Sequence, residues 1–165
     1  AMDEEGCACA PGEIGEIWIH SGSVVKGYWN NRQATAENFV GGFWRSGDLG
    51  SVDAQGFVRV FDRKKDMINR AGLKIYSAEV ESVLAGHPDV LESAVVARPC
   101  PVLGERVHAF VTPRREGVDP QALRAWCAER LSDYKVPETI TLLAEALPRN
   151  ANGKVLKRSL RDQLA

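Results

Sequence analysis

The run Asp62-Arg63-Lys64-Lys65-Asp66 decides how this sequence divides. All of its residues are charged and none supplies an apolar period, which is typical of a solvated segment rather than of a packed helix or strand. Before it, short runs of β-branched and aromatic residues alternate with Gly, Asn and Asp, whereas helical and strand patterns alternate after it. We therefore predict a domain boundary here, with a β-rich piece over residues 13–64 and a second domain over residues 65–165.

The part before the boundary is expected to consist of short strands and turns. Residues 1–12 are small and polar and include Pro11, which predicts a flexible lead-in. The composition further predicts strands over residues 16–20, 24–25 and 57–61, a helix over residues 32–39 and a hairpin turn over residues 53–56.

The part after the boundary is expected to alternate helices with strands. Ser77 is a candidate N-cap for a helix that Gly86 and Pro88 stop, and Asp119-Pro120 has the cap and first-turn residues of a second helix. Strands are predicted over residues 90–97, 107–112 and 139–143, and a final helix over residues 156–164. This order predicts the α+β class, a small domain with a three-stranded sheet and packed helices.

The composition gives no reason to expect nucleic acid, a membrane or a metal ion as a partner. The 165 residues hold 21 basic and 22 acidic side chains, and the formal net charge of -1 favours neither nucleic acid nor a membrane surface as a partner. No apolar run approaches the ~18 residues of a membrane span.

Cys7, Cys9, Cys100 and Cys127 are spaced irregularly, so neither a disulfide framework nor a metal site is expected. A reducing, cytoplasmic setting fits best.

Two short segments suggest nucleotide chemistry. Trp44-Arg45-Ser46-Gly47-Asp48 ends on a carboxylate at a predicted strand edge, where it could accept hydrogen bonds from a cis-diol, although an Asp beside a Gly is more often a turn residue. Lys154 follows the turn-forming residues Asn150, Asn152 and Gly153, which favour close approach to an anionic ligand, although an exposed loop lysine is the simpler interpretation. No role is expected for His20, His87 or His108.

Four segments in order resemble the C-terminal portion of adenylate-forming enzymes, the superfamily of acyl-CoA synthetases, peptide-synthetase adenylation domains and luciferases. The resemblance runs from Glu13 to the end of the chain and is strongest to acyl-CoA synthetases and fatty-acid–CoA ligases. It is carried by residues 15–35, 44–48, 62–75 and 148–158, and residues 131–137 are also similar to the family. Residues 15–35 are interpreted mainly as scaffold. Three positions depart from the usual family pattern, namely Ser46 for Thr, Asp62 for Gly and Ser77 for Pro.

The resemblance implies roles for five residues. It places Asp48 and Arg63 on the ribose of the nucleotide and Lys154 as the catalytic residue at the reacting phosphate. It makes Lys65 the hinge between two domain orientations, and residues 65–165 a mobile lid domain. It puts Gly72 beside the channel of the CoA pantetheine. Residues 13–64 would then be the end of a large adenylating domain.

The implied activity is an AMP-forming ligation of a fatty or aryl acid to CoA, with ATP, Mg²⁺ and CoA as substrates or cofactors. The family's phosphate loop, its adenine and magnesium segment and its acyl pocket are expected upstream of these residues. The chain alone is therefore expected to bind no cofactor tightly and to be inactive. The alternative is a noncatalytic module that binds a partner protein or an adenylating subunit. A β-rich piece this small should also expose apolar surface, which would favour self-association.

Overall fold

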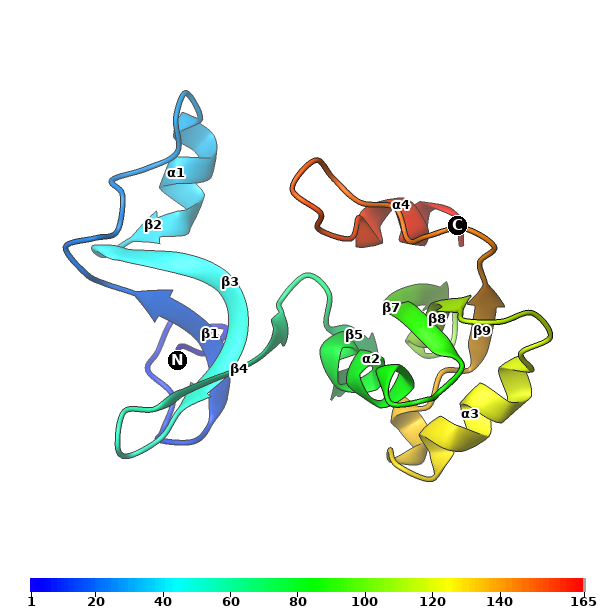
Figure 1. Cartoon of the computed structure of the whole chain (residues 1–165). Helices are drawn as coiled ribbons and strands as arrows, with labels where there is room; N and C mark the ends of the chain where they lie inside the picture. The colour runs from blue at the N-terminus through cyan, green and yellow to red at the C-terminus, as the bar shows by residue number, and fades with distance from the viewer. Residues whose placement is uncertain (165) are drawn as a thin grey trace. The chain divides into compact units, whose positions relative to one another are not determined.

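The computed structural model describes residues 1–164, and the chain divides into two compact units, Ala1–Lys65 and Asp66–Ala165. We call them the N-unit and the C-unit. Each has a β-sheet of its own (Figure 1). Among the described residues, no helix has the length and apolar character needed to cross a membrane. The four cysteines are all free, with Cys100 and Cys127 buried.

The N-unit is an antiparallel sheet organised around one long strand. β3 (Phe43–Val52) pairs with β1 (Ile14–Ile19), with β2 (Phe39–Val40) and with β4 (Val58–Arg63). Helix α1 (Arg32–Asn38) leads directly into β2, and the side chain of Asn31 caps its first turn by accepting from the backbone N–H of Ala34. Because β3 pairs with all the other strands of this sheet, its backbone is held by hydrogen bonds along both edges.

Two features of the N-unit differ from the sequence-based expectations, and a third agrees with them. The sequence indicated only a strand edge at Asp48 and not the ten-residue strand β3, because Gly47, Gly50 and its polar residues interrupt the alternating pattern. The predicted strand at residues 24–25 is wrong, since these residues lie in irregular chain after a turn in which the Ser21 carbonyl accepts from the N–H of Val24. The predicted turn at residues 53–56 is confirmed, and the carboxylate of Asp53 accepts from two backbone N–H groups within it.

The lead-in, residues 1–12, folds back on the sheet. Met2 exchanges two backbone hydrogen bonds with Glu16, of 2.9 and 2.7 Å, and the N–H of Gly12 donates to the carbonyl of Val52 at 2.8 Å. These bonds tie both ends of the segment to strands of the N-unit. Its flexibility stays a prediction.

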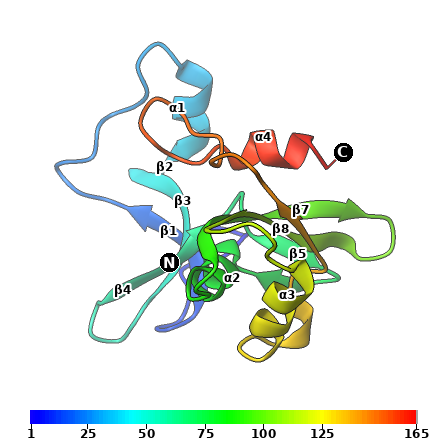
Figure 2. The same ribbon diagram turned by 45° about the vertical axis from the view of Figure 1, so that its right-hand side comes forward.

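The C-unit is built on a five-stranded sheet. β7 (Val90–Cys100) and β8 (Gly104–Pro113) form its long antiparallel hairpin (Figure 2). β9 (Thr139–Leu142) pairs in parallel with β8. β5 (Ile68–Arg70) and β6 (Leu73–Ile75) form a short hairpin, which pairs with the first residue of β8 through Arg70 and Gly104. The α+β class is confirmed. The sheet has five strands rather than the predicted three, because β5 and β6 lie within a segment whose charged residues hid their pattern.

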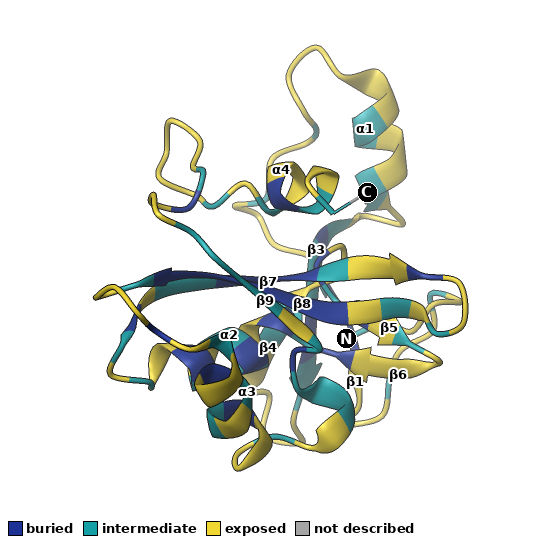
Figure 3. Ribbon diagram, turned by 90° about the vertical axis from the view of Figure 1, so that its right-hand side faces the viewer, coloured by how far each residue is buried: buried dark blue, intermediate teal, exposed yellow. Residues whose placement is uncertain are grey.

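Helices cover both faces of this sheet (Figure 3). α2 (Ser77–Ala85) and α3 (Pro120–Ala128) pack on one face, and α4 (Lys157–Asp162) packs on the other, while a short 3₁₀ turn, Asp133–Lys135, precedes β9. The larger core, under α2 and α3, contains Ile68, Ile75, Val80, Leu84, Val90, Val95, Val107, Ala109, Val111, Val118, Leu123 and Cys127. The smaller core, under α4, contains Ala94, Val96, Phe110, Leu147 and Leu160.

Two predicted helix caps have different outcomes. Asp119 caps α3 as expected, since its carboxylate accepts from the N–H of Gln121. Ser77 does not cap α2: Tyr76 occupies the N-cap position, and Ser77 is a fully buried residue of the helix itself. The hydroxyl of Ser77 instead accepts a hydrogen bond of 2.7 Å from the Lys157 ammonium at the start of α4. The Ser77 hydroxyl therefore makes a tertiary contact with Lys157 instead of the local contact expected of an N-cap.

A pair of leucine substitutions tests the larger core. Leu84 is fully buried, whereas Leu91 on β7 is 54% exposed. We expect Leu84→Ala to lower the free energy of unfolding of the chain by about 2–5 kcal/mol, because it leaves a cavity that the helix cannot close. The matched Leu91→Ala should change it by no more than about 0.5 kcal/mol. Chemical denaturation followed by circular dichroism measures both, and equal effects would contradict this packing.

Candidate functional site

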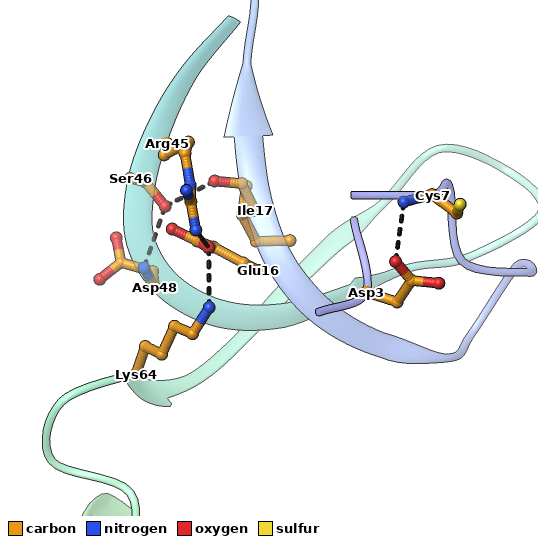
Figure 4. A network of polar contacts seen from close by, with 8 residues as sticks. All are labelled: Asp3, Cys7, Glu16, Ile17, Arg45, Ser46, Asp48 and Lys64. Carbon is orange, nitrogen blue, oxygen red and sulfur yellow. Dashed lines mark hydrogen bonds and ion pairs between the residues drawn. The ribbon is translucent and has the colours of Figure 1, made fainter. Parts of the chain in front are cut away.

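Asp48 and Arg63 lie opposite each other on β3 and β4 and form an ion pair, with 2.8 Å between Nε and Oδ1. Arg63 also donates to the carbonyl of Ser46 at 3.2 Å. The Ser46 hydroxyl donates to the carbonyl of Ile17 at 2.7 Å and accepts from the N–H of Asp48 at 3.0 Å (Figure 4). The structure therefore brings these two predicted site residues together, and Ser46 supplies a hydroxyl at the position where the family usually has Thr.

The carboxylate of Asp48 remains accessible. Its side chain is 29% exposed and that of Arg63 is 44% exposed, so a ligand hydroxyl can reach the oxygens that Arg63 leaves open. Gly47, with a φ of +73°, permits the local backbone turn, and its carbonyl accepts from the N–H of Lys64 at 2.8 Å. A partly exposed carboxylate held by a guanidinium is suited to accepting hydrogen bonds from a diol.

Beside this pair lies a buried carboxylate that sequence reasoning missed. Glu16 on β1 is 6% exposed and accepts from Arg45 at 3.0 Å and from Lys64 at 3.1 Å (Figure 4). Burial raises the pKa of Glu16, but the hydrogen bonds and charges of Arg45 and Lys64 outweigh it and hold that pKa below its ordinary value. Glu16 thus ties the end of β4 to β1. Residues 15–35, which begin with Gly15-Glu16, were interpreted mainly as scaffold, and nothing in their pattern indicated a charge network.

Lys65 is exposed and is the last residue of the N-unit, because the division between the units falls directly after it. Its position in the chain is that of a hinge candidate. Its role stays a prediction.

Gly72 forms the tip of the β5–β6 hairpin. Ala71 and Gly72 have φ values of +50° and +87°, the pattern that a two-residue hairpin turn with two left-handed positions requires. The Asn69 side chain accepts from the N–H of Gly72 at 2.9 Å. A Cβ on Gly72 would meet no atom within 4 Å, so the tip is open to an approaching molecule.

Lys154 is exposed at the end of a tight turn. Arg149 and Val155 pair as a β-bridge, and the N–H of Asn150 donates to the carbonyl of Lys154 at 2.9 Å. The side-chain oxygen of Asn150 accepts from the N–H groups of Asn152 and Lys154, at 3.0 and 2.9 Å, which closes the turn from inside. The Lys154 ammonium has no ion-pair partner among residues 1–164, so it is open to an anion.

The two loops of the C-unit lie at opposite ends of β7 (Figure 3). The Lys154 turn is attached near Glu92, which pairs with Thr112, whereas the Gly72 hairpin joins β8 at Gly104, opposite Cys100. The interval from Glu92 to Cys100 corresponds to about 26 Å of strand. Lys154 and Gly72 therefore belong to two separate surfaces of one unit.

His108 is a buried histidine of the C-unit that contacts two threonine side chains. It is buried on β8, with its ring nitrogens 2.6 Å from the Thr139 hydroxyl and 3.1 Å from the Thr141 hydroxyl. Burial, with a contribution from the charge of Arg98, lowers the pKa of His108 to about 4. The ring is therefore neutral at pH 7. Among residues 1–164, no group of three or more His, Cys, Asp or Glu is placed to hold a metal ion.

Comparison with known proteins gives a consistent family. Residues 79–154 match the AMP-binding enzyme C-terminal domain. Over 159 residues the chain is 45% identical to a 2-succinylbenzoate–CoA ligase of Geobacillus kaustophilus, covering 96% of this chain and 32% of that protein. It is also 40% identical to a long-chain-fatty-acid–CoA ligase of Yersinia pestis, covering 98% of this chain and 28% of that protein.

Solved structures similar to this chain include a CoA synthetase and an ATP-bound protein. The o-succinylbenzoate CoA synthetase of Bacillus subtilis in complex with its acyl-adenylate intermediate superposes with a TM-score of 0.90 at 39% identity, over 98% of this chain and 33% of that one. ATP-bound MatB from Rhodopseudomonas palustris gives 0.88 at 34% identity, over 98% of this chain and 32% of that one. The chain spans about a third of the length of these relatives. The chain is therefore homologous, over nearly its whole length, to the corresponding third of acyl-CoA and aryl-CoA ligases of the adenylate-forming superfamily, and residues 79–154 match the AMP-binding enzyme C-terminal domain.

Proposed function

We propose that this chain is the C-terminal part of an AMP-forming ligase that joins a fatty or aryl carboxylic acid to CoA. The observation that carries the proposal is the match over nearly the whole chain to a CoA synthetase whose structure holds an acyl-adenylate, the intermediate of such a reaction. The two charged features described above fit that chemistry. One is the Asp48–Arg63 pair, suited to a ribose, and the other is the Lys154 ammonium, which has no ion-pair partner in the described part of the chain and is suited to a phosphate.

In the first half-reaction, a carboxylate oxygen of the acid attacks the α-phosphorus of ATP, the acyl–phosphate bond forms and pyrophosphate leaves. Both reactants are anionic, and negative charge builds on the phosphate oxygens. The Lys154 ammonium would stabilise that charge, because a donor fixed before the reaction costs no reorganisation during it. Asp48 would accept hydrogen bonds from the ribose hydroxyls while Arg63 holds its carboxylate. Mg²⁺ enters such a reaction with ATP, and we assign no residue of this chain to it.

In the second half-reaction, the CoA thiolate attacks the acyl carbon, the thioester forms and AMP leaves. We propose that the C-unit changes its orientation about Lys65 between the two steps. The separation of the Lys154 turn from the Gly72 hairpin supports this, since one orientation would present the ammonium and the other the hairpin tip to the reacting centre. Gly72 would then line the pantetheine path.

A noncatalytic interaction module is the second candidate. The observation that favours it is the exposed apolar side chains of the β4 region, with Phe57 75%, Val58 56% and Val60 59% exposed. The same surface favours self-association of the isolated chain. The remainder of a longer ligase would cover it equally well. The isolated chain is proposed to be inactive and to bind no cofactor tightly, because the resemblance places the phosphate loop, the adenine and magnesium segment and the acyl pocket upstream of these residues.

Lys154→Ala tests the first half-reaction. In the product of the complete gene, acid-dependent pyrophosphate release across a panel of fatty and aryl acids should fall by about two to three orders of magnitude. Lys26→Ala, the loss of another exposed lysine, should leave it unchanged. Absence of pyrophosphate release with every acid in the panel, from a folded full-length product, would favour the noncatalytic module.

Asp48→Asn tests the ribose contact. The change removes the charge and one hydrogen-bond acceptor, so the KM for ATP should rise by about tenfold or more while kcat changes less. Asp3→Asn is the matched control, because among residues 1–164 the Asp3 carboxylate accepts only from the N–H of Cys7 within its own turn (Figure 4). An unchanged KM for ATP would remove Asp48 from the nucleotide site.

Gly72→Ala tests the hairpin tip. A Cβ at a φ of +87° costs about 1 kcal/mol of local strain and also narrows the proposed pantetheine path, so thioester formation from preformed acyl-adenylate should slow more than adenylate formation does. Ala71→Gly relieves strain at the neighbouring position and should leave both half-reactions intact. Equal slowing of both half-reactions by Gly72→Ala would argue for a purely structural glycine.

A further inference from the structure

We propose that Glu92 is a positioning residue for Lys154, acting through Arg149 and the backbone of the turn between them. This inference rests on the proposed function, because it assumes that Lys154 serves adenylate formation. Glu92 was not singled out by any motif of the sequence. Its role follows from the contacts that it makes at the end of β7.

Both oxygens of the Glu92 carboxylate hold the segment that leads to Lys154. Oε1 accepts from the N–H of Leu147 at 2.8 Å, and Oε2 accepts from Nη2 of Arg149. The other terminal nitrogen of Arg149, Nη1, donates to the carbonyl of Gly153 at 2.8 Å. The Arg149 guanidinium therefore links Glu92 on β7 of the C-unit sheet to the peptide that joins Gly153 to Lys154.

This link fixes one side of the turn, and a second anchor fixes the other. After the turn, the Lys157 ammonium lies 2.7 Å from both the Ser77 hydroxyl and the Glu81 carboxylate of α2, and its side chain is only 16% exposed. Leu160 is fully buried in the smaller core. The chain is thus held at both ends, with Lys154 between them as the exposed cation.

The chemistry of Glu92 suits this task. Its side chain is 20% exposed, so water screens the pair with Arg149 less than it would screen an open surface pair. The backbone hydrogen bond from Leu147, together with Arg149, holds the pKa of Glu92 below its ordinary value although burial opposes this. A carboxylate that stays ionised at neutral pH keeps the guanidinium in one orientation, and planar donors in a fixed orientation set the position of the carbonyl they bind.

A purely structural role for Glu92 makes a different prediction. If the carboxylate only stabilised the fold, its loss would affect the two half-reactions alike and would add to the loss of Lys154. A positioning role affects adenylate formation selectively. In addition, loss of Glu92 should have no further effect once the Lys154 ammonium has been removed, because residues that act as a unit have non-additive effects.

The experiment uses the product of the complete gene and four variants: Glu92→Gln, Lys154→Ala, the double variant, and Glu79→Gln as a matched control. Glu92→Gln keeps an oxygen for the N–H of Leu147 but removes the charge that holds Arg149. Glu79→Gln removes a carboxylate of the same unit that pairs with Lys135 at 2.8 Å, away from the turn. Pyrophosphate release reports adenylate formation, and thioester formation is measured separately from preformed acyl-adenylate.

We expect Glu92→Gln to slow pyrophosphate release by about tenfold or more, since a misplacement of about 1 Å can cost up to about a hundredfold. Thioester formation from acyl-adenylate and the Glu79→Gln variant should stay within about twofold of the parent. The double variant should be no slower than Lys154→Ala alone. Amide hydrogen exchange at residues 152–154 should quicken in Glu92→Gln while exchange within β7 does not, which tests the link without any reference to activity.

Other outcomes overturn the proposal. These are an unchanged rate of pyrophosphate release in Glu92→Gln, equal slowing of both half-reactions, or additive losses in the double variant. If Glu92→Gln does not fold, Arg149→Lys keeps the charge but lacks the planar fork, and it must show the same selective loss. If Lys154→Ala leaves pyrophosphate release unchanged, the proposed role of Lys154 fails first, which separates that failure from failure of the positioning role.

Discussion

The pairing of β7 with β8 is the constraint on which the C-unit depends. The two strands run side by side from Val90 opposite Pro113 to Cys100 opposite Gly104. Their residues are apolar on both faces, with Val95 and Val107 in one core and Val96 and Phe110 in the other. A sheet that is apolar on both sides must be covered on both sides. That requirement places α2 and α3 on one face and α4 on the other, and it brings Lys157 of α4 to Ser77 and Glu81 of α2.

The same hairpin separates the two loops of the C-unit. The β5–β6 hairpin joins at the tip of β7–β8, and the turn before α4 is anchored at the opposite end of β7. A rigid sheet between two loops keeps their separation constant. In the proposed mechanism this matters because the unit must withdraw one loop when it presents the other. The separation is a property of strand length, which eleven residues of β7 determine.

Charge pairs position side chains here more than they stabilise the fold. The side chains of Arg63 and Asp48 are both partly exposed to water, and exposed pairs of that kind contribute at most about 1 kcal/mol to stability. Their value lies in geometry, since each keeps a flexible side chain in one orientation. The Glu16 network differs because the Glu16 carboxylate itself is buried, and it is the common partner of the partly exposed side chains of Arg45 and Lys64. Loss of Arg45 and Lys64 would leave a buried charge without a partner.

The sequence by itself determined the family resemblance, the α+β class, the main helices and strands of the C-unit and five candidate residues. Those features follow from local pattern: apolar periodicity, the Asp119-Pro120 helix start and the Asn-Gly turn before Lys154. Only the tertiary structure decided that β3 is the central strand of its sheet, that β5 and β6 extend the other, and that Ser77 is buried against Lys157. It alone brought Asp48 to Arg63 and Glu92 to Arg149, partners 15 and 57 positions apart. The physical reason is that strand pairing and ion pairing join residues that are distant along the chain, and no local pattern encodes which of many charges will meet.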